Sequence, residues 1–435
     1  MRKSRLILLT VMSILILGVL IPAQAQSPVT ITMATWTGVD EAAQLQKILD
    51  KINEGNTEYQ IVHQPLPADY YTQIQTQLAG GTAADLLWMD QNHMSLAADG
   101  SFLPLTDCVA NAKAGTAGDV KDYYPGVIQT AYQGDTLYGL PWIAQPVVVY
   151  FNKNLFDAAK IAYPTTDWTW DDFTKDATAL TKDTDGDGKL DQWGTIANGW
   201  PPPQMFIWQA GGDVISSDLS TSPIDSPEAV AGLDFYRSWA YNPAMAPSAD
   251  TITEQGFDAL YSSGKIAMFF GGASDDKDYK VSGFTPGVVP PPKNPTTGSN
   301  ITFAWTASTV INAATTHPKE ACDALLAVSE GIDNWKVVSP RISQATVEHL
   351  TASVPEKGPN AQAFLDAAKN MSAFRIVPKY MEWEGLLWSE YLTPLLNNQT
   401  DLSTAELAKQ VRPDLEALLP GPSEATATAE ATPAS

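Results

Sequence analysis

An uninterrupted apolar run at residues 147–151 dominates the hydrophobic pattern in the middle of the chain. All five residues are β-branched or aromatic, which favours a strand buried on both faces, as in an α/β fold with helices on both sides. Pro141 and Pro146 precede the run, so the chain enters it with restricted backbone freedom and little helical alternative. This pattern is typical of a hinge segment between two lobes.

The first third of the chain alternates between strand-type and helix-type patterns. Apolar runs at 29–34, 60–62 and 84–90 are separated by amphipathic stretches at 41–52 and 70–78. Strand and helix in alternation predict a parallel sheet. We therefore expect an α/β fold class.

The remainder of the chain is richer in helix patterns. The expected helices lie at 170–180, 228–239, 257–263 and 318–329, and the expected strands at 266–270 and 309–312. A proline-rich passage at 286–295 predicts an extended loop of the polyproline type. Helices with short breaks follow over 361–419, and the Ala, Thr, Glu, Ser and Pro residues of 421–435 predict a disordered tail.

Residues 1–25 have the pattern of a secretory signal peptide. Basic residues precede an apolar run that ends at the small-x-small site Ala23-Gln24-Ala25. We therefore expect an exported protein, either periplasmic or extracellular and attached to the cell surface, with an uncleaved N-terminal anchor as the alternative. A lipoprotein signal requires a cysteine directly after the apolar run, and the first cysteine is Cys108.

The charge balance bears on the choice of partner. The 435 residues carry 26 Lys and Arg against 49 Asp and Glu, a net charge of −23. Phosphate backbones and anionic membranes repel such a chain, so nucleic acid and lipid surfaces are poor candidates. The length exceeds what one hydrophobic core usually supports, which predicts two domains.

Cysteine and histidine residues are few. An exported chain permits a disulfide between Cys108 and Cys322, and the alternative is two buried thiols that pack as small hydrophobic groups. The four histidines are far apart and lack the spacing of metal ligands. No catalytic motif with a nucleophile elbow, a phosphate loop or a dinucleotide fingerprint is present.

An acidic loop at 183–191 has the spacing of an EF-hand calcium loop. The expected oxygen ligands are Asp183, Asp185, Asp187, the Lys189 carbonyl and Asp191, with Gly188 at the sixth position. Gly194 stands at the twelfth position, where an EF-hand has a bidentate glutamate. Calcium binding that steadies this part of the chain is one interpretation, and a plain acidic turn is the other.

Several segments, in this order, resemble the family 1 extracellular solute-binding proteins, the maltose-binding-protein-like, sugar-binding components of bacterial ABC importers. The matching segments are Ala79-Gly80-Gly81-Thr82-Ala83-Ala84-Asp85, Tyr138-Gly139-Leu140-Pro141, Tyr150-Phe151-Asn152-Lys153-Asn154-Leu155-Phe156, Thr169-Trp170-Asp171-Asp172-Phe173, residues 257–268 and His317-Pro318-Lys319-Glu320-Ala321-Cys322. Each segment is short, and their common order covers nearly the whole mature chain.

The resemblance implies a two-lobed periplasmic-binding-protein-like fold of type II, with lobes joined by crossing hinge segments. Lobe one would comprise residues 27–142 and 304–345, and lobe two residues 146–301 and 350–420. On this map both cysteines fall in lobe one, which favours the disulfide.

The resemblance also implies a sugar site in the cleft between the lobes. Sugars have apolar faces and a rim of hydroxyl groups, so they need flat aromatic surfaces and directional polar partners. The candidate ligand-binding residues are Trp36, Asp90, Gln91, Trp142, Gln145, Trp200, Gly272, Trp305 and Trp383. Gln145 replaces a ligand-contacting carboxylate of the maltose-binding relative, which leaves the identity of the sugar open.

The implied function is capture of a carbohydrate, most simply an oligosaccharide, and its delivery to the permease subunits of an ABC transporter. The chain would act as a monomer and need no cofactor for this task. The alternative is a secreted carbohydrate-active enzyme of the glycosidase type, for which Asp171-Asp172 and Glu382 with Glu384 are the nearest carboxylate pairs. A surface adhesin with the tail as its stalk is a third possibility.

Overall fold

The computed structural model describes residues 27–197, 200–333, 335 and 338–421. The predicted signal peptide and, apart from Gly421, the predicted tail lie outside the described residues.

The predicted alternation of strands and helices is confirmed in the first part of the chain. β1 (Val29–Thr35), α1 (Val39–Asn53), β2 (Tyr59–Pro65), α2 (Tyr70–Ala79) and β3 (Leu86–Asp90) follow one another. β1 pairs in parallel with both β2 and β3. Ile31 and Met33 of β1 are fully buried in the core. A shift of the β1 pairing by one residue would turn these side chains to the other face, so their burial fixes the register of β1 in the sheet.

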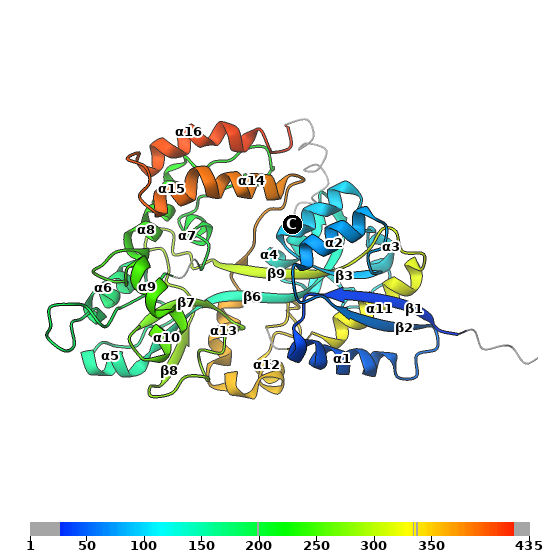
Figure 1. Cartoon of the computed structure of the whole chain (residues 1–435), viewed down its shortest axis with the longest axis horizontal. Coiled ribbons are helices and arrows are strands. Elements are labelled where there is room, and N and C mark those ends of the chain that lie inside the picture. The colour runs from blue at the N-terminus through cyan, green and yellow to red at the C-terminus, as the bar shows by residue number, and fades with distance from the viewer. Residues whose placement is uncertain (1–26, 198–199, 334, 336–337, 422–435) are drawn as a thin grey trace, which may run out of the picture.

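Two long strands cross the middle of the molecule, β6 (Gly139–Asn152) and β9 (Thr302–Ile311). β6 runs antiparallel to β9 over residues 139–146, and over 147–152 it pairs with β7 (Met268–Gly272) and β8 (Pro286–Val289). β9 also pairs with β3. The two strands therefore belong to both halves of one sheet, with the order β2-β1-β3-β9-β6-β7 (Figure 1).

The prediction that the central strand begins after Pro146 is wrong, because β6 continues through both prolines. The ladder shifts its register between Pro141 and Ile143, which accommodates the first ring. Pro146 lacks an N–H group, but its carbonyl accepts a hydrogen bond from the Ala273 N–H at 3.0 Å. The predicted loop at 286–295 is also partly wrong, since its first residues form β8.

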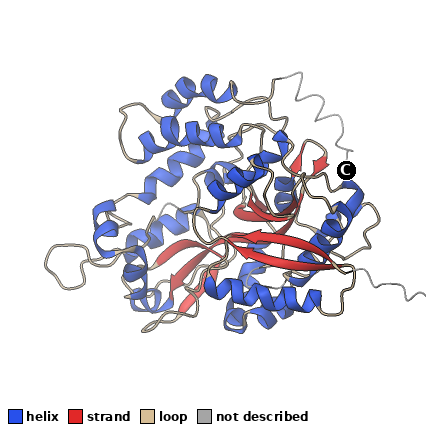
Figure 2. Ribbon diagram, turned by 45° about the vertical axis from the view of Figure 1, so that its right-hand side comes forward, coloured by secondary structure: helices blue, strands red, loops and turns tan. Residues whose placement is uncertain are grey.

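Helices cover both faces of the sheet (Figure 2). The main helices of the second half are α6 (Trp170–Leu180), α7 (Gln204–Gln209), α8 (Pro227–Ala240) and α10 (Phe257–Ser262), and α11 (Pro318–Gly331) returns to pack on α1 and β9. α6 begins with a capping box in which Thr169 and Asp172 exchange hydrogen bonds. Pro227 occupies the first turn of α8, where its missing N–H costs no hydrogen bond.

The remaining elements are short, apart from the helix α16 of 13 residues. They are η1 (Asn92–Asp99), α3 (Thr106–Val109), η2 (Val120–Asp122), α4 (Pro125–Ile128), η3 (Gln129–Ala131), β4 (Tyr132–Gln133), β5 (Thr136–Leu137), α5 (Lys153–Ala159), α9 (Ala249–Gln255), α12 (Val347–Ser353), η4 (Pro355–Asn360), α13 (Ala361–Ala368), β10 (Met371–Ser372), α14 (Tyr380–Leu386), η5 (Leu387–Leu392), α15 (Thr393–Leu396) and α16 (Thr404–Glu416).

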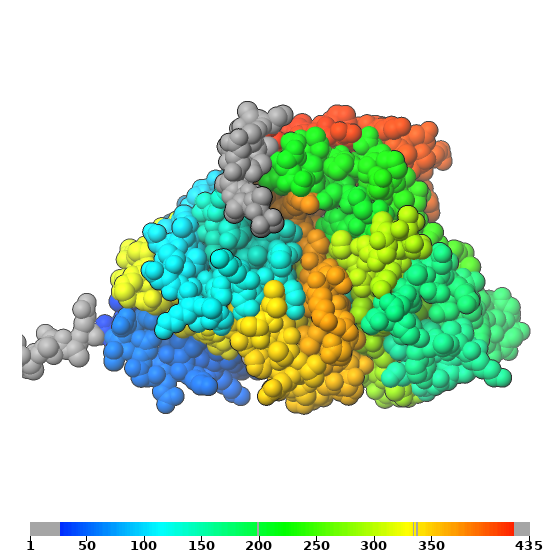
Figure 3. All heavy atoms as spheres, turned by 180° about the vertical axis from the view of Figure 1, so that it is seen from behind, coloured from blue at the N-terminus to red at the C-terminus, as the bar shows by residue number. Residues whose placement is uncertain are grey.

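The elements form two lobes joined by β6 and β9 (Figure 1). We call the part around β1, β2, β3, α1 and α2 the first lobe, and the part around β7, α6, α7, α8 and α14–α16 the second lobe. Seen from behind, the orange segment that links α12 to α14 rises between the cyan first lobe and the green second lobe (Figure 3). The exact lobe boundaries drawn from the sequence stay a prediction.

Candidate functional site

A cavity of about 420 Å³ opens where the crossing strands meet the second lobe. It is lined by Gln145, Trp200, Gly272, Asp275 and Trp305, and we call it compartment one. Gln145 on β6 and Trp305 on β9 are direct partners in the strand ladder, so their side chains lie on the same face of the sheet. The sequence predicted four of these five residues as ligand contacts, and the structure brings those four together.

Gly272 is required for the shape of compartment one. A Cβ atom on this residue would lie 1.7 Å from Gln145 Nε2, so the Gln145 side chain crosses directly over the glycine. The Gln145 amide thereby stays at the cavity wall, where it offers both a donor and an acceptor.

Asp275 is a cleft residue that sequence reasoning missed. Its Oδ2 accepts a hydrogen bond from the Gly272 N–H at 3.1 Å, and its backbone carbonyl accepts one from Lys357 Nζ at 2.6 Å. Burial raises the pKa of the Asp275 carboxyl group. The available signal was its position three residues after Gly272, which the family resemblance had placed near the solute.

A second cavity, of about 200 Å³, adjoins the first, and we call it compartment two. Its lining residues are Gln91, Asn92, Trp200, Pro202, Phe303, Trp305, Phe374, Glu384 and Trp388. Trp200 and Trp305 line both compartments, so the two cavities adjoin, and we call them together the cleft. Gln91 and Asn92 come from the first lobe, and Glu384 and Trp388 come from the second, so the cleft lies between the lobes.

Asn92 and Glu384 join the two lobes across compartment two. Asn92 Nδ2 donates to Glu384 Oε2 at 2.9 Å, and the Tyr380 hydroxyl donates to Glu384 Oε1 at 3.4 Å. Burial, with a further contribution from the Asp90 carboxylate, raises the pKa of Glu384 to about 7. The hydrogen bond from Tyr380 and the nearby His93 oppose this shift.

Gln91 and Asp90 occupy different environments although they are adjacent in sequence. Gln91 lines compartment two, and its Oε1 accepts the Thr306 N–H at 3.2 Å. Asp90 lies outside both cavity linings and pairs instead with His93 Nδ1 at 2.7 Å. A solute contact from Asp90 stays a prediction, and its carboxylate contributes, after burial, to the raised pKa of Glu384.

Three tryptophans that the sequence placed at the solute lie outside the linings of both compartments. Trp142 is only 4% exposed and stacks on Trp88, with ring centroids 4.0 Å apart. Trp383 is 1% exposed and packs near Tyr380 in the core. Trp36 is half-buried in the Trp142 cluster, 6.2 Å from the Trp305 ring. The predictions for Trp142 and Trp383 are corrected because these two rings fill the interior of the protein, and solute contact by Trp36 stays a prediction.

Cys108 and Cys322 are joined by a disulfide that connects α3 to α11. Their Cα atoms are 5.8 Å apart, and the bond closes a loop with a sequence separation of 214. The alternative of two buried thiols is thus not what the structure shows.

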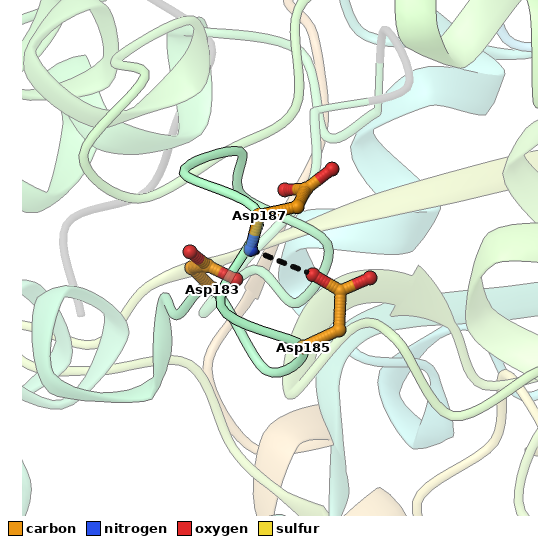
Figure 4. Close-up of side chains that lie close together, drawn as sticks. All are labelled: Asp183, Asp185 and Asp187. Atoms are coloured by element: carbon orange, nitrogen blue, oxygen red, sulfur yellow. Dashed lines mark hydrogen bonds between the residues drawn. The ribbon is translucent and has the colours of Figure 1, made fainter.

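The acidic loop forms a compact, exposed turn. Asp183, Asp185 and Asp187 each offer a carboxylate oxygen, and these oxygens lie within 4.8 Å of one another (Figure 4). Asp191 lies outside this group, and its carboxylate accepts both the N–H and the hydroxyl of Thr184. Gly194 leaves no room for a twelfth-position glutamate, because a Cβ there would lie 1.9 Å from the Ala177 carbonyl oxygen. Calcium binding, with the Lys189 carbonyl as a ligand, stays a prediction.

The carboxylate pairs considered for an enzyme do not face a common substrate position. Asp172 accepts the Thr169 N–H at 2.9 Å in the capping box of α6, and Asp171 beside it lies on a surface groove between α6 and α8. Glu382 is exposed, whereas Glu384 lines the cleft. Residues two apart on a helix point in different directions.

Comparisons with known proteins agree with this architecture. The family model of the bacterial extracellular solute-binding proteins matches residues 36–326. A binding protein of Brucella abortus is 25% identical over 199 residues, which are 43% of this chain and 45% of that protein. The match thus spans less than half of the length of this relative.

Solved structures match over a larger part of the chain. The ABC substrate-binding protein of Listeria monocytogenes in complex with cycloalternan has a TM-score of 0.71 at 22% identity, over 90% of this chain and 98% of that one. The cyclic α-maltosyl-1,6-maltose binding protein of Arthrobacter globiformis has a TM-score of 0.71 at 16% identity, over 90% and 99%. At these identities the likeness establishes the two-lobed fold, and the family match over residues 36–326 shows that the chain belongs to the bacterial extracellular solute-binding proteins.

Proposed function

We propose that this protein captures a carbohydrate between its two lobes and delivers it to the permease subunits of an ABC transporter. The observation that carries the proposal is the composition of the cleft. Trp200 and Trp305 supply aromatic faces along both compartments, while Gln145, Asp275 and Glu384 supply polar groups beside them. Sugars present the matching surfaces, apolar C–H faces with a rim of hydroxyl groups.

The structural neighbours support a sugar as the solute. The Listeria monocytogenes protein is a complex with cycloalternan, and the Arthrobacter globiformis protein binds cyclic α-maltosyl-1,6-maltose. Both proteins share the two-lobed fold of this chain. We extend the ligand class to this chain on the strength of its cleft.

The crossing strands provide the mechanism of capture. β6 and β9 contribute Gln145 and Trp305 to the cleft and continue into both lobes. A solute that contacts both lobes stabilises the closed form, and the closed form is the one that a permease recognises. We propose that the protein performs this task as an exported monomer, on the outer side of the cytoplasmic membrane. Among the described helices, none has both the length and the apolar character needed to cross a membrane.

Calorimetry combined with product analysis tests the proposal. The protein would be titrated with glucose, maltose, maltotriose and mannotriose, and the same mixtures would be analysed for sugar products by chromatography. Saturable heat without products supports a binding protein. Turnover of any sugar supports the glycosidase alternative, and the absence of heat with every sugar contradicts a carbohydrate ligand.

Small-angle scattering tests the closure step on the same samples. The radius of gyration should fall when the best-bound sugar is added and should not change with a sugar that gives no heat. Binding with an unchanged radius would contradict capture by closure of the lobes.

A further inference from the structure

One wall of compartment one is bonded to a buried lysine that lies outside the cavity, Lys357 of η4. We propose that Lys357 is a positioning residue for solute binding, because its ammonium holds the turn at residues 272–275 and thereby sets the Asp275 carboxylate at the cavity wall. Lys357 belongs to the lining of neither compartment, so it acts on the solute only through this turn. The inference rests on the proposed function, because it concerns the binding of the same solute.

The turn at residues 272–275 joins Asp275 to Gly272 by two hydrogen bonds. The Asp275 N–H donates to the Gly272 carbonyl oxygen at 3.0 Å, and the Gly272 N–H donates to Asp275 Oδ2 at 3.1 Å. The position of the Asp275 carboxylate therefore follows the position of the turn. Because the Gln145 side chain crosses over Gly272, a displacement of the turn also changes the room that is left for the Gln145 amide.

The Asp275 carbonyl oxygen connects this turn to η4. It accepts a hydrogen bond from Lys357 Nζ at 2.6 Å, across a sequence separation of 82 residues, and a longer one from the Tyr150 hydroxyl at 3.3 Å. The Tyr150 hydroxyl lies closer to the Gly272 carbonyl oxygen, at 2.8 Å, so its single proton serves that bond. The charged lysine is therefore the main donor to the Asp275 carbonyl.

The ammonium group of Lys357 is itself fixed in a buried site. The Lys357 side chain is 2% exposed, and its Nζ donates to Asp278 Oδ1, on a fully buried side chain, at 3.0 Å. Nζ also lies 4.5 Å from the centroid of the Phe364 ring, within the range of a cation–π contact. Burial lowers the pKa of Lys357, and the Asp278 carboxylate opposes this shift. These contacts restrict the position of Nζ, and with it the position of the Asp275 carbonyl.

The energetics of a buried ion pair favour a positional role for Lys357. Moving two charges out of water costs free energy that their attraction only partly returns, and neutral residues of similar volume often give equal or greater stability. Such a pair is therefore a poor source of stability, whereas its directed hydrogen bonds fix the groups around it. Here one of the fixed groups is a backbone carbonyl of the cleft wall.

The experiment is a double-mutant cycle that couples Lys357 to Asp275. Isothermal titration with maltotriose, or with whichever of glucose, maltose and mannotriose the wild type binds more tightly, is performed on the wild type, on Lys357→Met/Asp278→Asn, on Asp275→Asn and on the triple variant. Lys357→Met is combined with Asp278→Asn so that neither charge stays buried without the other. Lys280→Gln is the matched control, because Lys280 pairs with Asp276 in the same segment and its side chain is 66% exposed.

The expected result is a loss of affinity that does not add to the loss from Asp275. Lys357→Met/Asp278→Asn and Asp275→Asn should each weaken binding about tenfold. The triple variant should bind no more weakly than Asp275→Asn, because both changes act through one carboxylate. Lys280→Gln should bind as the wild type does. A merely structural role of Lys357 predicts losses that multiply in the triple variant.

Thermal unfolding shows which variants are folded. If Lys357→Met/Asp278→Asn does not fold, Asp278→Asn alone takes its place in the same cycle, because it keeps the lysine but removes the charge that fixes it. Unchanged affinity in the folded variant, unchanged affinity in Asp275→Asn, or losses that multiply would each overturn the positioning role and leave carbohydrate capture intact. Absence of binding by the wild type with every sugar overturns the proposed function together with this inference.

Discussion

The side-chain amide of Gln145 crosses directly over Gly272, so close that a Cβ atom on the glycine would lie 1.7 Å from Gln145 Nε2. The two residues lie on neighbouring strands, β6 and β7, and both line compartment one. The position of the amide in the cleft thus depends on the absence of a side chain at residue 272.

Gly272→Ala is therefore expected to weaken solute binding. The methyl group would displace the Gln145 side chain from the cavity wall and remove its hydrogen bonds to the solute, a loss of about 1–2 kcal/mol. Calorimetry with the best-bound sugar measures the effect. Gly385→Ala is the control, because a Cβ there meets nothing within 4 Å. Equal affinities in all three proteins would show that Gln145 does not contact the solute.

Trp305 and Trp142 should respond differently to truncation. Trp305→Ala should weaken sugar binding by about 1–3 kcal/mol, because its ring forms a wall of both compartments. Trp142→Ala should instead lower the free energy of unfolding by about 3–5 kcal/mol, because Trp142 is buried against Trp88. Calorimetry and denaturant unfolding of both variants separate the two effects. A large loss of affinity in a stable Trp142→Ala protein would contradict the placement of this ring in the core.

Glu384 should make the stability of the protein depend on pH. Its pKa rises from 4.5 to about 7 on folding, so the folded state holds the proton more tightly than the unfolded state. The resulting stabilisation is complete below pH 4.5 and is lost as the pH rises through 7. The change should be about 1–2 kcal/mol, since solvent screens this half-buried group.

The measurement is the unfolding free energy of wild type, Glu384→Gln and Glu382→Gln at pH 5 and pH 8. The unfolding free energy of the wild type should be higher at pH 5 than at pH 8 by the contribution of Glu384. Glu384→Gln should lack this contribution, and Glu382→Gln should retain it. If the unfolding free energy changes equally between pH 5 and pH 8 in the wild type and in Glu384→Gln, the pKa of Glu384 is not raised by folding.

Reduction of the disulfide should destabilise the first lobe. The bond between Cys108 and Cys322 closes a loop with a sequence separation of 214, so its loss enlarges the unfolded ensemble considerably. Replacing both residues by Ser should cost about 2–5 kcal/mol, to be measured by thermal unfolding with and without a reductant. The wild-type protein should lose stability in the reductant, and the double variant should not respond to it. A reductant effect in both proteins would point to a different cause.

Calcium should raise the unfolding temperature if the acidic loop binds it. The relevant carboxylates are Asp183, Asp185 and Asp187, whose oxygens already lie within 4.8 Å of one another. Millimolar CaCl₂ should stabilise the wild type, and Asp185→Asn should abolish most of the shift. Asp191→Asn is the comparison within the loop, because Asp191 bonds to Thr184 and not to the cluster. No shift in the wild type, or the same shift in Asp185→Asn, would favour a plain acidic turn.

Local patterns in the sequence were sufficient for much of the fold. The alternation of β1, α1, β2, α2 and β3 follows from the spacing of apolar residues, and the cap of α6 follows from Thr169 and Asp172. The true length of β6 was not predicted. Its pairing with β9 on one side and with β7 and β8 on the other overrides the local preference of Pro141 and Pro146.

The sequence by itself determined which local elements form, because the spacing of apolar residues encodes them. Its resemblance to a known family also indicated cleft candidates, among them Gln91, Gln145, Trp200, Gly272 and Trp305. Only the tertiary structure separated Trp142 from Gln145. Trp142 lies at the register shift between Pro141 and Ile143 and packs in the core against Trp88, whereas Gln145 pairs with Trp305 and faces the cleft. Long-range packing of the two lobes, which no local pattern encodes, brings the other lining residues to the cleft. These residues are Asn92, Asp275, Glu384 and Trp388.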